Sequence, residues 1–319
     1  MTWLVTGGAG YIGAHIVHAL LEADEKVVIL DDLSTGLATR APASVPLIKA
    51  DVSDCAAVTA ALRDYDAEGV IHLAARKDVG ESVADPLRYY RENIDGLRSV
   101  LQAVTATGVR SFVFSSSAAV YGESAAGRVS ESSPTAPSNP YGRSKLVGEW
   151  MLRDVSAATD LRHIALRYFN VAGAASMPLA DIGETNLLPR LLRAVAEGRR
   201  AQVYGGRHPT PDGSCVRDFI DVRDLAEAHV AAALALRGGT VRQDVLNVGR
   251  GVGISVLEMI EAVRRICDVD LPADIVPARA GDPPAVVAIA DRIRTVLGWQ
   301  ARHDLASIVS SAWSAVVTR

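Results

Sequence analysis

A glycine cluster near the N-terminus constrains the fold more than any other part of the sequence. The apolar run Trp3–Thr6 leads directly into the glycine-rich stretch Gly7–Gly13. A helical pattern follows from Ile12 to Leu21, and a second apolar run, Lys26–Leu30, ends in two aspartates. A strand, a glycine turn, a helix, a strand and an acidic residue in this order predict one right-handed βαβ unit.

The spacing inside this unit is typical of a dinucleotide-binding turn. One glycine permits the tight turn, one lets the backbone approach a pyrophosphate, and one lets the helix pack on the strand. Free N–H groups and the dipole at the helix start would hold the phosphates. Asp31 follows Gly13 by eighteen residues, where a carboxylate accepts the ribose hydroxyls of an adenosine. Because this carboxylate would repel a 2′-phosphate and the next arginine is Arg40, we expect NAD rather than NADP.

Strands and helices continue to alternate along the next part of the chain. Apolar runs at Leu47–Val52, Val70–Ala75, Ser111–Ser117 and Ile164–Asn170 predict further strands, and a long helix is expected from Pro86 to Thr107. This pattern predicts an α/β fold with a doubly wound parallel sheet of the Rossmann type. Ligands in such sheets bind beyond the carboxyl ends of the strands. The glycine turn and the later strand ends should therefore meet at one crevice.

The regular alternation breaks after about residue 171, where Gly, Pro and Asp turns dominate. A helix at 222–236 and a strand at 245–248 would return to the first sheet. We therefore expect an NAD-binding domain at 1–170, rejoined by 222–248. A second, smaller α/β domain at 171–221 and 249–319 would bind the substrate.

Composition excludes several other classes of protein. The chain has 319 residues, of which 49% are hydrophobic and 22% charged, and its net charge is -4. This balance is typical of an ordinary globular protein and argues against a nucleic-acid or membrane surface. The start of the sequence resembles no signal peptide, and Cys55, Cys215 and Cys267 show no metal-ligand spacing. We therefore expect a cytoplasmic protein with reduced cysteines and no bound metal.

A tyrosine and a lysine four residues apart provide candidate catalytic groups. Asn139-Pro140 predicts a helix start, which would place Tyr141 and Lys145 on one face of the helix. A phenol normally loses its proton near pH ~10. A neighbouring ammonium group and the positive end of the helix would lower the pKa, so that the pair could exchange protons near neutral pH. The alternative is an ordinary surface helix, where this spacing is common.

Taken together, these motifs resemble the extended short-chain dehydrogenase/reductase family and, within it, the UDP-glucose 4-epimerases, over essentially the full length. The resemblance rests on eight stretches: Thr6–Gly13, Asp31–Gly36, Lys77–Ser82, Ser115–Gly122, Tyr141–Lys145, Arg167–Asn170, Pro209–Gly213 and Val216–Ile220. It implies a UDP-hexose 4-epimerase that interconverts UDP-galactose and UDP-glucose through a 4-keto intermediate and transient NADH. It also implies a homodimer that pairs through the helices of residues 86–107 and 141–160.

The resemblance assigns roles to individual residues. Ser117, Tyr141 and Lys145 would be catalytic. The residues implied to bind NAD are Gly7, Gly10, Tyr11, Ile12, Gly13, Asp31, Asp32, Leu33, Ser34, Thr35, Gly36, Asp51, Val52, Leu73, Ala74, Ala75, Lys77, Asn93, Ser115, Tyr141, Lys145 and Tyr168. Those implied to bind the UDP-sugar are Lys77, Ser117, Tyr141, Asn170, Asn186, Leu187, Gln202, Tyr204, Arg217, Arg279, Asp282 and Val286. Two arginines suit a diphosphate in a chain without a metal constellation, although Arg217 and Asp218 could instead form a surface ion pair.

Two departures from the family pattern affect the substrate side. The segment from Ala174 to Glu184 is shorter than in many members, which leaves the contacts that close over the sugar open. Val286 stands where many members restricted to UDP-glucose and UDP-galactose carry tyrosine. A small residue there should make room beside the sugar C2 substituent, so we expect UDP-N-acetylglucosamine and its galacto epimer also to be accepted.

Other reactions on the same fold remain alternatives. A 4,6-dehydratase carries carboxylates directly after the position of Ser117, where this chain has Ala118 and Ala119. An alanine side chain cannot carry a proton, so these two residues disfavour a dehydratase and a UDP-glucuronate decarboxylase. A UDP-glucuronate 4-epimerase stays open, since only the C5 substituent differs. A non-enzymatic dinucleotide sensor is disfavoured because it needs no serine, tyrosine and lysine together.

Overall fold

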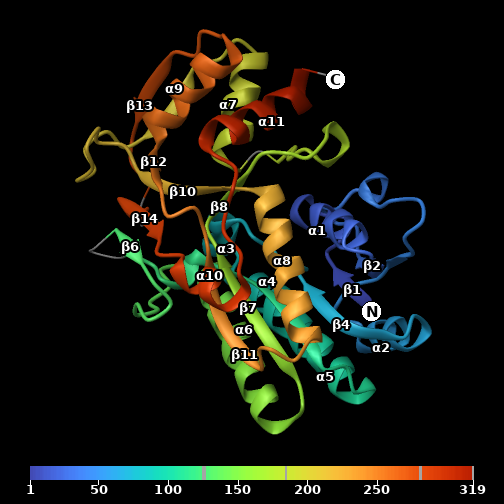
Figure 1. Ribbon diagram of the computed structural model, residues 1–319. Coiled ribbons are helices and arrows are strands. Elements are labelled where there is room, and N and C mark those ends of the chain that lie inside the picture. The colour runs from blue at the N-terminus through green and yellow to red at the C-terminus, as the bar shows by residue number, and fades with distance from the viewer. Residues whose placement is uncertain (124–126, 184, 280–281, 318–319) are drawn as a thin grey trace.

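A parallel sheet of seven strands forms the centre of the larger part of the molecule (Figure 1). The computed structural model describes residues 1–123, 127–183, 185–279 and 282–317. The strand order is β11–β7–β5–β4–β1–β2–β3. These strands are β1 (Thr2–Thr6), β2 (Lys26–Asp31), β3 (Leu47–Lys49), β4 (Ala67–His72), β5 (Ser111–Ser117), β7 (Arg162–Tyr168) and β11 (Gln243–Val248). The order reverses between β1 and β4, which creates a crevice at their carboxyl ends. The predicted Rossmann-type fold is confirmed.

Helices cover both faces of this sheet. One face carries α1 (Tyr11–Glu22), α8 (Val222–Arg237) and α10 (Asp291–Leu297), and the other carries α2 (Cys55–Asp64), α5 (Gly96–Thr107) and α6 (Pro140–Ala158). Side chains alternate between the two faces along each strand. In β1, Trp3 and Val5 pack in the cluster that contains α1 and α8, whereas Leu4 packs in the cluster that contains α2 and α5. The strands are therefore buried on both sides, as is usual for parallel sheets.

The predicted long helix from Pro86 to Thr107 is interrupted. A short helix α3 (Val79–Ala84) precedes α4 (Pro86–Tyr89), and a π-helical turn (Tyr90–Asp95) connects α4 to α5. Such turns insert one extra residue into a helix and are frequent at functional sites. The side chain of Asn93 therefore points in a direction that a regular helix would not give it.

The smaller part of the molecule contains α7 (Leu187–Ala196), α9 (Val256–Cys267) and α11 (Leu305–Val317), which lie together at one end in Figure 1. Its sheet has the order β12–β10–β14–β6, with β8 beside β10, and β9 pairs separately with β13. The bounds of these strands are β6 (Arg128–Val129), β8 (Asn170–Ala172), β9 (Ala201–Tyr204), β10 (Val216–Asp221), β12 (Gly253–Ser255), β13 (Ala273–Val276) and β14 (Ala285–Ala288). Three short 3-10 helices span Ala38–Arg40, Ala118–Val120 and Met177–Leu179.

The chain passes between the two parts more than once. Strand β11 extends the large sheet beside β7, and α8 packs in the same core cluster. Strand β6, by contrast, pairs with β14 of the smaller part. Within the described residues, no helix has both the length and the apolar character needed to cross a membrane.

Candidate active site

The glycine turn brings three backbone segments into close contact. Gly7 has φ of +74°, and a Cβ atom there would lie 2.9 Å from the backbone nitrogen of Ala74. A Cβ atom on Gly13 would lie 2.1 Å from the carbonyl oxygen of Gly7. Gly10 is the N-cap of α1 and provides no side-chain hydrogen bond, so the first amides of the helix keep free N–H groups. The turn therefore offers the cradle that a pyrophosphate requires.

Asp31 closes the adenosine side of this cradle. Its carboxylate is 6% exposed and accepts hydrogen bonds from the backbone N–H groups of Ala9 and Leu33, both at 2.9 Å. Burial raises the pKa of Asp31, although these two N–H groups lower it. A Cβ atom on Gly36 would lie 2.8 Å from Oδ1, so only glycine lets the loop pass this close to the carboxylate. Each oxygen keeps a lone pair for a ribose hydroxyl, which fits the predicted dinucleotide.

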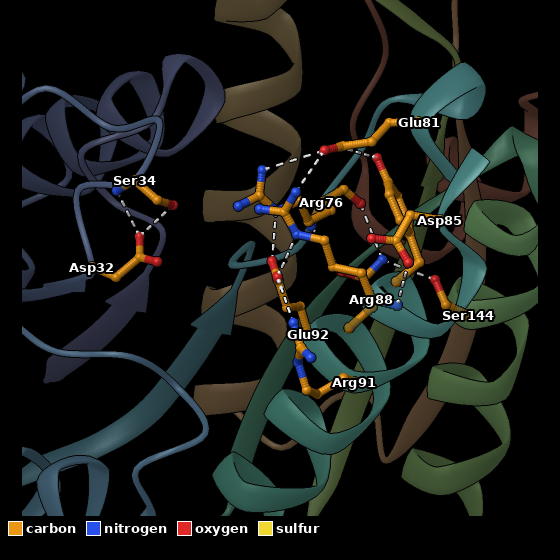
Figure 2. Close-up of polar contacts among 11 residues, drawn as sticks. Asp32, Ser34, Arg76, Glu81, Asp85, Arg88, Arg91, Glu92 and Ser144 are labelled. Atoms are coloured by element: carbon orange, nitrogen blue, oxygen red, sulfur yellow. Dashed lines mark hydrogen bonds and ion pairs between the residues drawn. The ribbon is translucent and has the colours of Figure 1, made fainter. Parts of the chain in front are cut away.

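The other predicted cofactor residues border the same loops. Asp32 accepts hydrogen bonds from the N–H and hydroxyl groups of Ser34 (Figure 2). Strand β4 ends at His72 and β3 ends at Lys49, so part of the predicted strands is loop. Among the predicted cofactor residues, Asp51 and Val52 follow β3. Leu73, Ala74, Ala75 and Lys77 follow β4, and Thr35 lies in the loop after Asp31.

Both side-chain donors of Asn93 are used in contacts within the protein. Its Oδ1 accepts from the N–H of Arg76, and its Nδ2 donates to the Arg76 carbonyl and to Ser144 Oγ. Arg76 is further held by Glu92, and Figure 2 shows this pair beside Arg88. The predicted direct contact between Asn93 and the cofactor therefore has no free donor. Asn93 instead fixes the loop after β4 against helix α6.

The candidate catalytic side chains converge at the carboxyl end of β5. The side chain of Asn139 caps α6 by accepting from Gly142 N at 2.8 Å. Ser117, the last residue of β5, lies beside Tyr141, and its hydroxyl lowers the pKa of the Tyr141 phenol. Lys145 Nζ donates to the Ser115 carbonyl at 2.8 Å and lies 6.0 Å from the centre of the Tyr141 ring. The predicted helix face is therefore present.

The ionisation of this pair differs from the prediction. Burial raises the pKa of Tyr141, and the hydrogen bond with Ser117 lowers it. Burial also lowers the pKa of Lys145 to about 7. In the protein without cofactor, the expected lowering of the Tyr141 pKa by Lys145 is therefore wrong, because a large part of the buried amine is uncharged near neutral pH. Sequence spacing cannot reveal this, since burial depends on the tertiary fold.

Tyr168 borders the same centre from the adjacent strand β7. Burial, and to a smaller extent the nearby Tyr141, raise the pKa of Tyr168, whereas the Ser115 side chain lowers it. The Ser115 hydroxyl also contacts His229 Nε2 of α8 at 2.9 Å. These contacts fix both Ser115 and Tyr168 at the crevice.

The predicted diphosphate residues gather where β10 meets β14. Arg217 is paired in register with Val286, donates to the Pro283 carbonyl at 2.8 Å and lies 3.9 Å from Asp282. The alternative of a surface pair between Arg217 and Asp218 is wrong, because Asp218 is fully buried. Its carboxylate accepts instead from three backbone N–H groups, which leaves Arg217 directed elsewhere.

The predicted uridine side is built on Tyr204. The guanidinium of Arg279 lies 3.8 Å from the centre of its ring. Hydrogen bonds from Arg279 and then Arg190 lower the pKa of Tyr204. Arg190 also donates to Gln202 at 3.3 Å, and sequence reasoning missed it. Its position four residues after Asn186 on α7 was the available signal.

Three other predicted substrate residues lie at the ends of elements. Asn186 is the N-cap of α7, and its side chain donates to Asp181 at 2.7 Å rather than capping the helix. Leu187 is the first residue of that helix. Asn170 is exposed at the start of β8.

These features define a class of protein. A Rossmann-type sheet has a glycine cradle at its switch point, and a serine, a tyrosine and a lysine converge at the end of β5. This arrangement is that of a dinucleotide-dependent enzyme of the short-chain dehydrogenase/reductase type.

The chain belongs to the NAD dependent epimerase/dehydratase family, whose model matches residues 3–249. It is 45% identical to a UDP-glucose 4-epimerase of Azospirillum brasilense over 98% of this chain and 90% of the relative. A UDP-glucose 4-epimerase structure from Stenotrophomonas maltophila, with bound NAD and formylated UDP-arabinopyranose, has a TM-score of 0.95 at 39% identity. It covers 100% of this chain and 98% of that one. The UDP-Glc/GlcNAc 4-epimerase of Campylobacter jejuni has a TM-score of 0.87 at 38% identity, with 100% and 99% coverage.

The buried amine of Lys145 should make stability depend on pH. Its folded-state pKa of about 7 lies below the usual value, so charging it in the fold opposes folding. This cost is fully present below about pH 7 and disappears as the pH rises toward ~10.4, where the unfolded chain also loses the proton. In protein stripped of nucleotide, Lys145→Met should increase the free energy of unfolding by a few kcal/mol at pH 6, and by clearly less at pH 9.5.

Denaturant unfolding at both pH values measures this difference. Lys49→Met, at an exposed position on β3, is the matched control and should change little at either pH. An equal gain at both pH values for Lys145→Met would contradict the assignment of a buried, weakly basic amine.

Proposed function

We propose that the protein is an NAD-dependent UDP-hexose 4-epimerase that interconverts UDP-galactose and UDP-glucose. The observation that carries this proposal is the convergence of Ser117, Tyr141 and Lys145 at the end of β5, in a fold shared with UDP-glucose 4-epimerases over its whole length. The glycine cradle and Asp31 fit the dinucleotide that the reaction requires. NAD, when bound there, supplies the reversible oxidation at C4 of the sugar.

The residues of the chain manage the proton at the sugar 4-hydroxyl. Tyr141 Oη accepts this proton when C4 is oxidised and returns it when C4 is reduced on the other face. The Ser117 hydroxyl, beside Tyr141, shares the same sugar oxygen and keeps the transfer path short. Lys145, anchored on the Ser115 carbonyl, holds its amine near the Tyr141 ring and would bind the nicotinamide ribose. A bound cofactor cation would lower the pKa of Tyr141, which burial alone raises.

Arginines hold the diphosphate of the substrate while its sugar rotates. In this proposal Arg217 and Arg279 bind the diphosphate, and Tyr204 and Gln202 bind the uridine. Release of the sugar from contacts, with the diphosphate kept in place, allows both faces of C4 to be presented. Arg190 adds a third guanidinium at this site.

The competing reactions lack their acid and base. Ala118 and Ala119 form the start of a 3-10 helix directly after Ser117. No carboxylate stands at these two positions to eliminate water or assist decarboxylation. The relatives named UDP-glucose 4-epimerase favour a neutral hexose over a uronic acid.

Purified protein incubated with UDP-galactose, without added NAD, should form UDP-glucose, as measured by chromatography. Tyr141→Phe should reduce kcat roughly 100- to 10,000-fold, because the proton acceptor is lost while the ring still packs. Wild-type protein that carries NAD but leaves UDP-galactose unchanged would overturn the proposal.

Val286 should determine whether the larger acetylated sugars are accepted. Val286 lies on β14, is 8% exposed and packs with Val120 and Phe169. The Campylobacter jejuni relative is named for both UDP-Glc and GlcNAc. We expect the wild type to turn over UDP-N-acetylglucosamine. Val286→Tyr should reduce that activity at least tenfold by filling space, with UDP-galactose turnover of the same variant as the control for folding.

Equal ratios of the two activities in wild type and Val286→Tyr would show that this position does not select the sugar. A wild type inactive on the acetylated pair would remove the broader specificity and leave the hexose reaction in place.

We also propose a homodimer in the cytoplasm. Helices α3, α4 and α6 pack together and expose Val83 (64%), Leu87 (77%) and Trp150 (48%). A second copy would remove these apolar side chains from water. The free thiols agree with a reducing compartment.

Leu87→Glu should convert a dimer to monomers in size-exclusion chromatography with light scattering, because a charge would be buried at the interface. Ile275→Glu, at a 68% exposed position on β13, is the matched control and should leave the mass unchanged. A monomeric wild type would refute the dimer.

A further inference from the structure

Three consecutive serines at the end of β5 each contact helix α6. The outer two carry the contacts to Tyr141 and Lys145 described above. Between them, Ser116 donates from Oγ to Glu149 Oε1 at 2.5 Å. Glu149 follows Lys145 by one helical turn and Tyr141 by two, so the three side chains lie along one stripe of the helix. None of the proposed catalytic roles uses Ser116 or Glu149.

Glu149 forms a buried, two-point ion pair with Arg167 of β7. Arg167 Nε donates to Oε1 at 2.9 Å, and its Nη2 donates to Oε2 at 2.6 Å. The two side chains are only 5% and 7% exposed. Arg167 also stands directly opposite Ser116 in the register of β5 and β7. Helix α6 is therefore attached by one carboxylate to two adjacent strands of the large sheet.

The same network continues into the smaller part of the molecule. Arg167 Nη1 donates to the Tyr121 hydroxyl at 3.0 Å, and this hydroxyl donates to Asn247 Oδ1 at 2.6 Å. Asn247 Nδ2 donates in turn to the carbonyl groups of Val129 at 3.0 Å and Ile289 at 3.3 Å. Val129 belongs to β6, and Ile289 directly follows β14. One continuous hydrogen-bond path thus joins the catalytic helix to the strand pair that carries Val286.

Stability alone is a poor reason for such a network. A buried ion pair loses much hydration, and well-packed apolar residues of similar volume are often as stable or more so. What a fully bonded, two-point pair supplies is a fixed geometry. Here the fixed elements are those whose relative position sets the distance between the hydroxyls of Ser117 and Tyr141.

We propose that Glu149, with Ser116 and Arg167, is a positioning device that holds α6 in register with the end of β5 and thereby keeps Tyr141 beside Ser117. Through Tyr121 and Asn247 the same device ties the β6–β14 edge of the sugar site to the catalytic helix. The catalytic part of this inference rests on the proposed epimerase function, whereas the geometric part concerns the ionisation of Tyr141 itself.

A loosened register should be visible in the titration of Tyr141. The hydrogen bond with Ser117 lowers the pKa of this phenol, so its loss should raise that pKa. The other titratable groups around the phenol are Lys145 on α6 and Tyr168 on β7, with His72 of β4 facing Lys145. The variants below leave all three unchanged.

The experiment compares Ser116→Ala with Ser156→Ala on the holoenzyme. Ser116 contacts α6 and Ser156 lies on it, so both variants remove one buried hydroxyl at this helix. The Ser156 hydroxyl donates to the Leu161 carbonyl at the far end of the helix. Ser116→Ala should lower kcat about tenfold with little change in KM, because a displaced proton acceptor affects the chemical step. The acid limb of kcat should move upward by about half a pH unit or more. Ser156→Ala should leave kcat and the position of its acid limb unchanged.

A second measurement does not depend on turnover. The phenolate of Tyr141 is titrated by near-ultraviolet difference absorbance between each protein and its Tyr141→Phe counterpart. Ser116→Ala and Glu149→Gln should both raise the pKa of Tyr141, and Ser156→Ala should not. If the wild type proves inactive on UDP-sugars, the proposed function fails while this titration still tests the positioning device.

The inference is overturned if Ser116→Ala and Ser156→Ala lose kcat and melting temperature in the same proportion, with unshifted titrations. That result would assign the network a structural role only. Should Glu149→Gln fail to fold because Arg167 is left without a carboxylate, Ser116→Ala decides the outcome, since it removes only a neutral group.

Discussion

Helix α6 is bonded to successive residues at the end of strand β5, and the candidate active site depends on this contact. The backbone carbonyl of Ser115 holds Lys145, the hydroxyl of Ser116 holds Glu149, and Ser117 lies beside Tyr141. A parallel sheet provides the fixed strand end, and the cap at Asn139 fixes where the helix begins. Reactive groups therefore sit on rigid elements rather than on loops, which is what precise proton transfer requires.

The same site concentrates buried polar groups that oppose folding. Lys145 is 3% exposed, and its amine donates a hydrogen bond to the Ser115 carbonyl. Asp31 and Asp218 are buried carboxylates whose pKa values burial raises, and both are held by backbone N–H groups. The apolar clusters on the two faces of the sheet offset these costs. Buried groups with shifted pKa values of this kind are typical of functional sites.

Much of this arrangement is predictable from local sequence, for identifiable reasons. The stretch Gly7–Gly13 and the Tyr141–Lys145 spacing depend on turn and helix geometry, which is set within a few residues. The π-helical turn around Asn93 and the burial that shifts the Lys145 pKa depend on packing between distant segments. Arg190 and Glu149 look like ordinary helix charges in the sequence, and only the fold shows what they contact.

The pairing of β6 with β14 has a consequence for biosynthesis. Arg128 of β6 is paired in register with Val287, near the C-terminal end of the chain, and β11 completes the large sheet only after the smaller part has begun. The glycine turn therefore emerges from the ribosome long before β11 and β14 are synthesised. The nascent chain exposes an unpaired strand edge during that interval, and such edges are where aggregation competes with completion of the native structure.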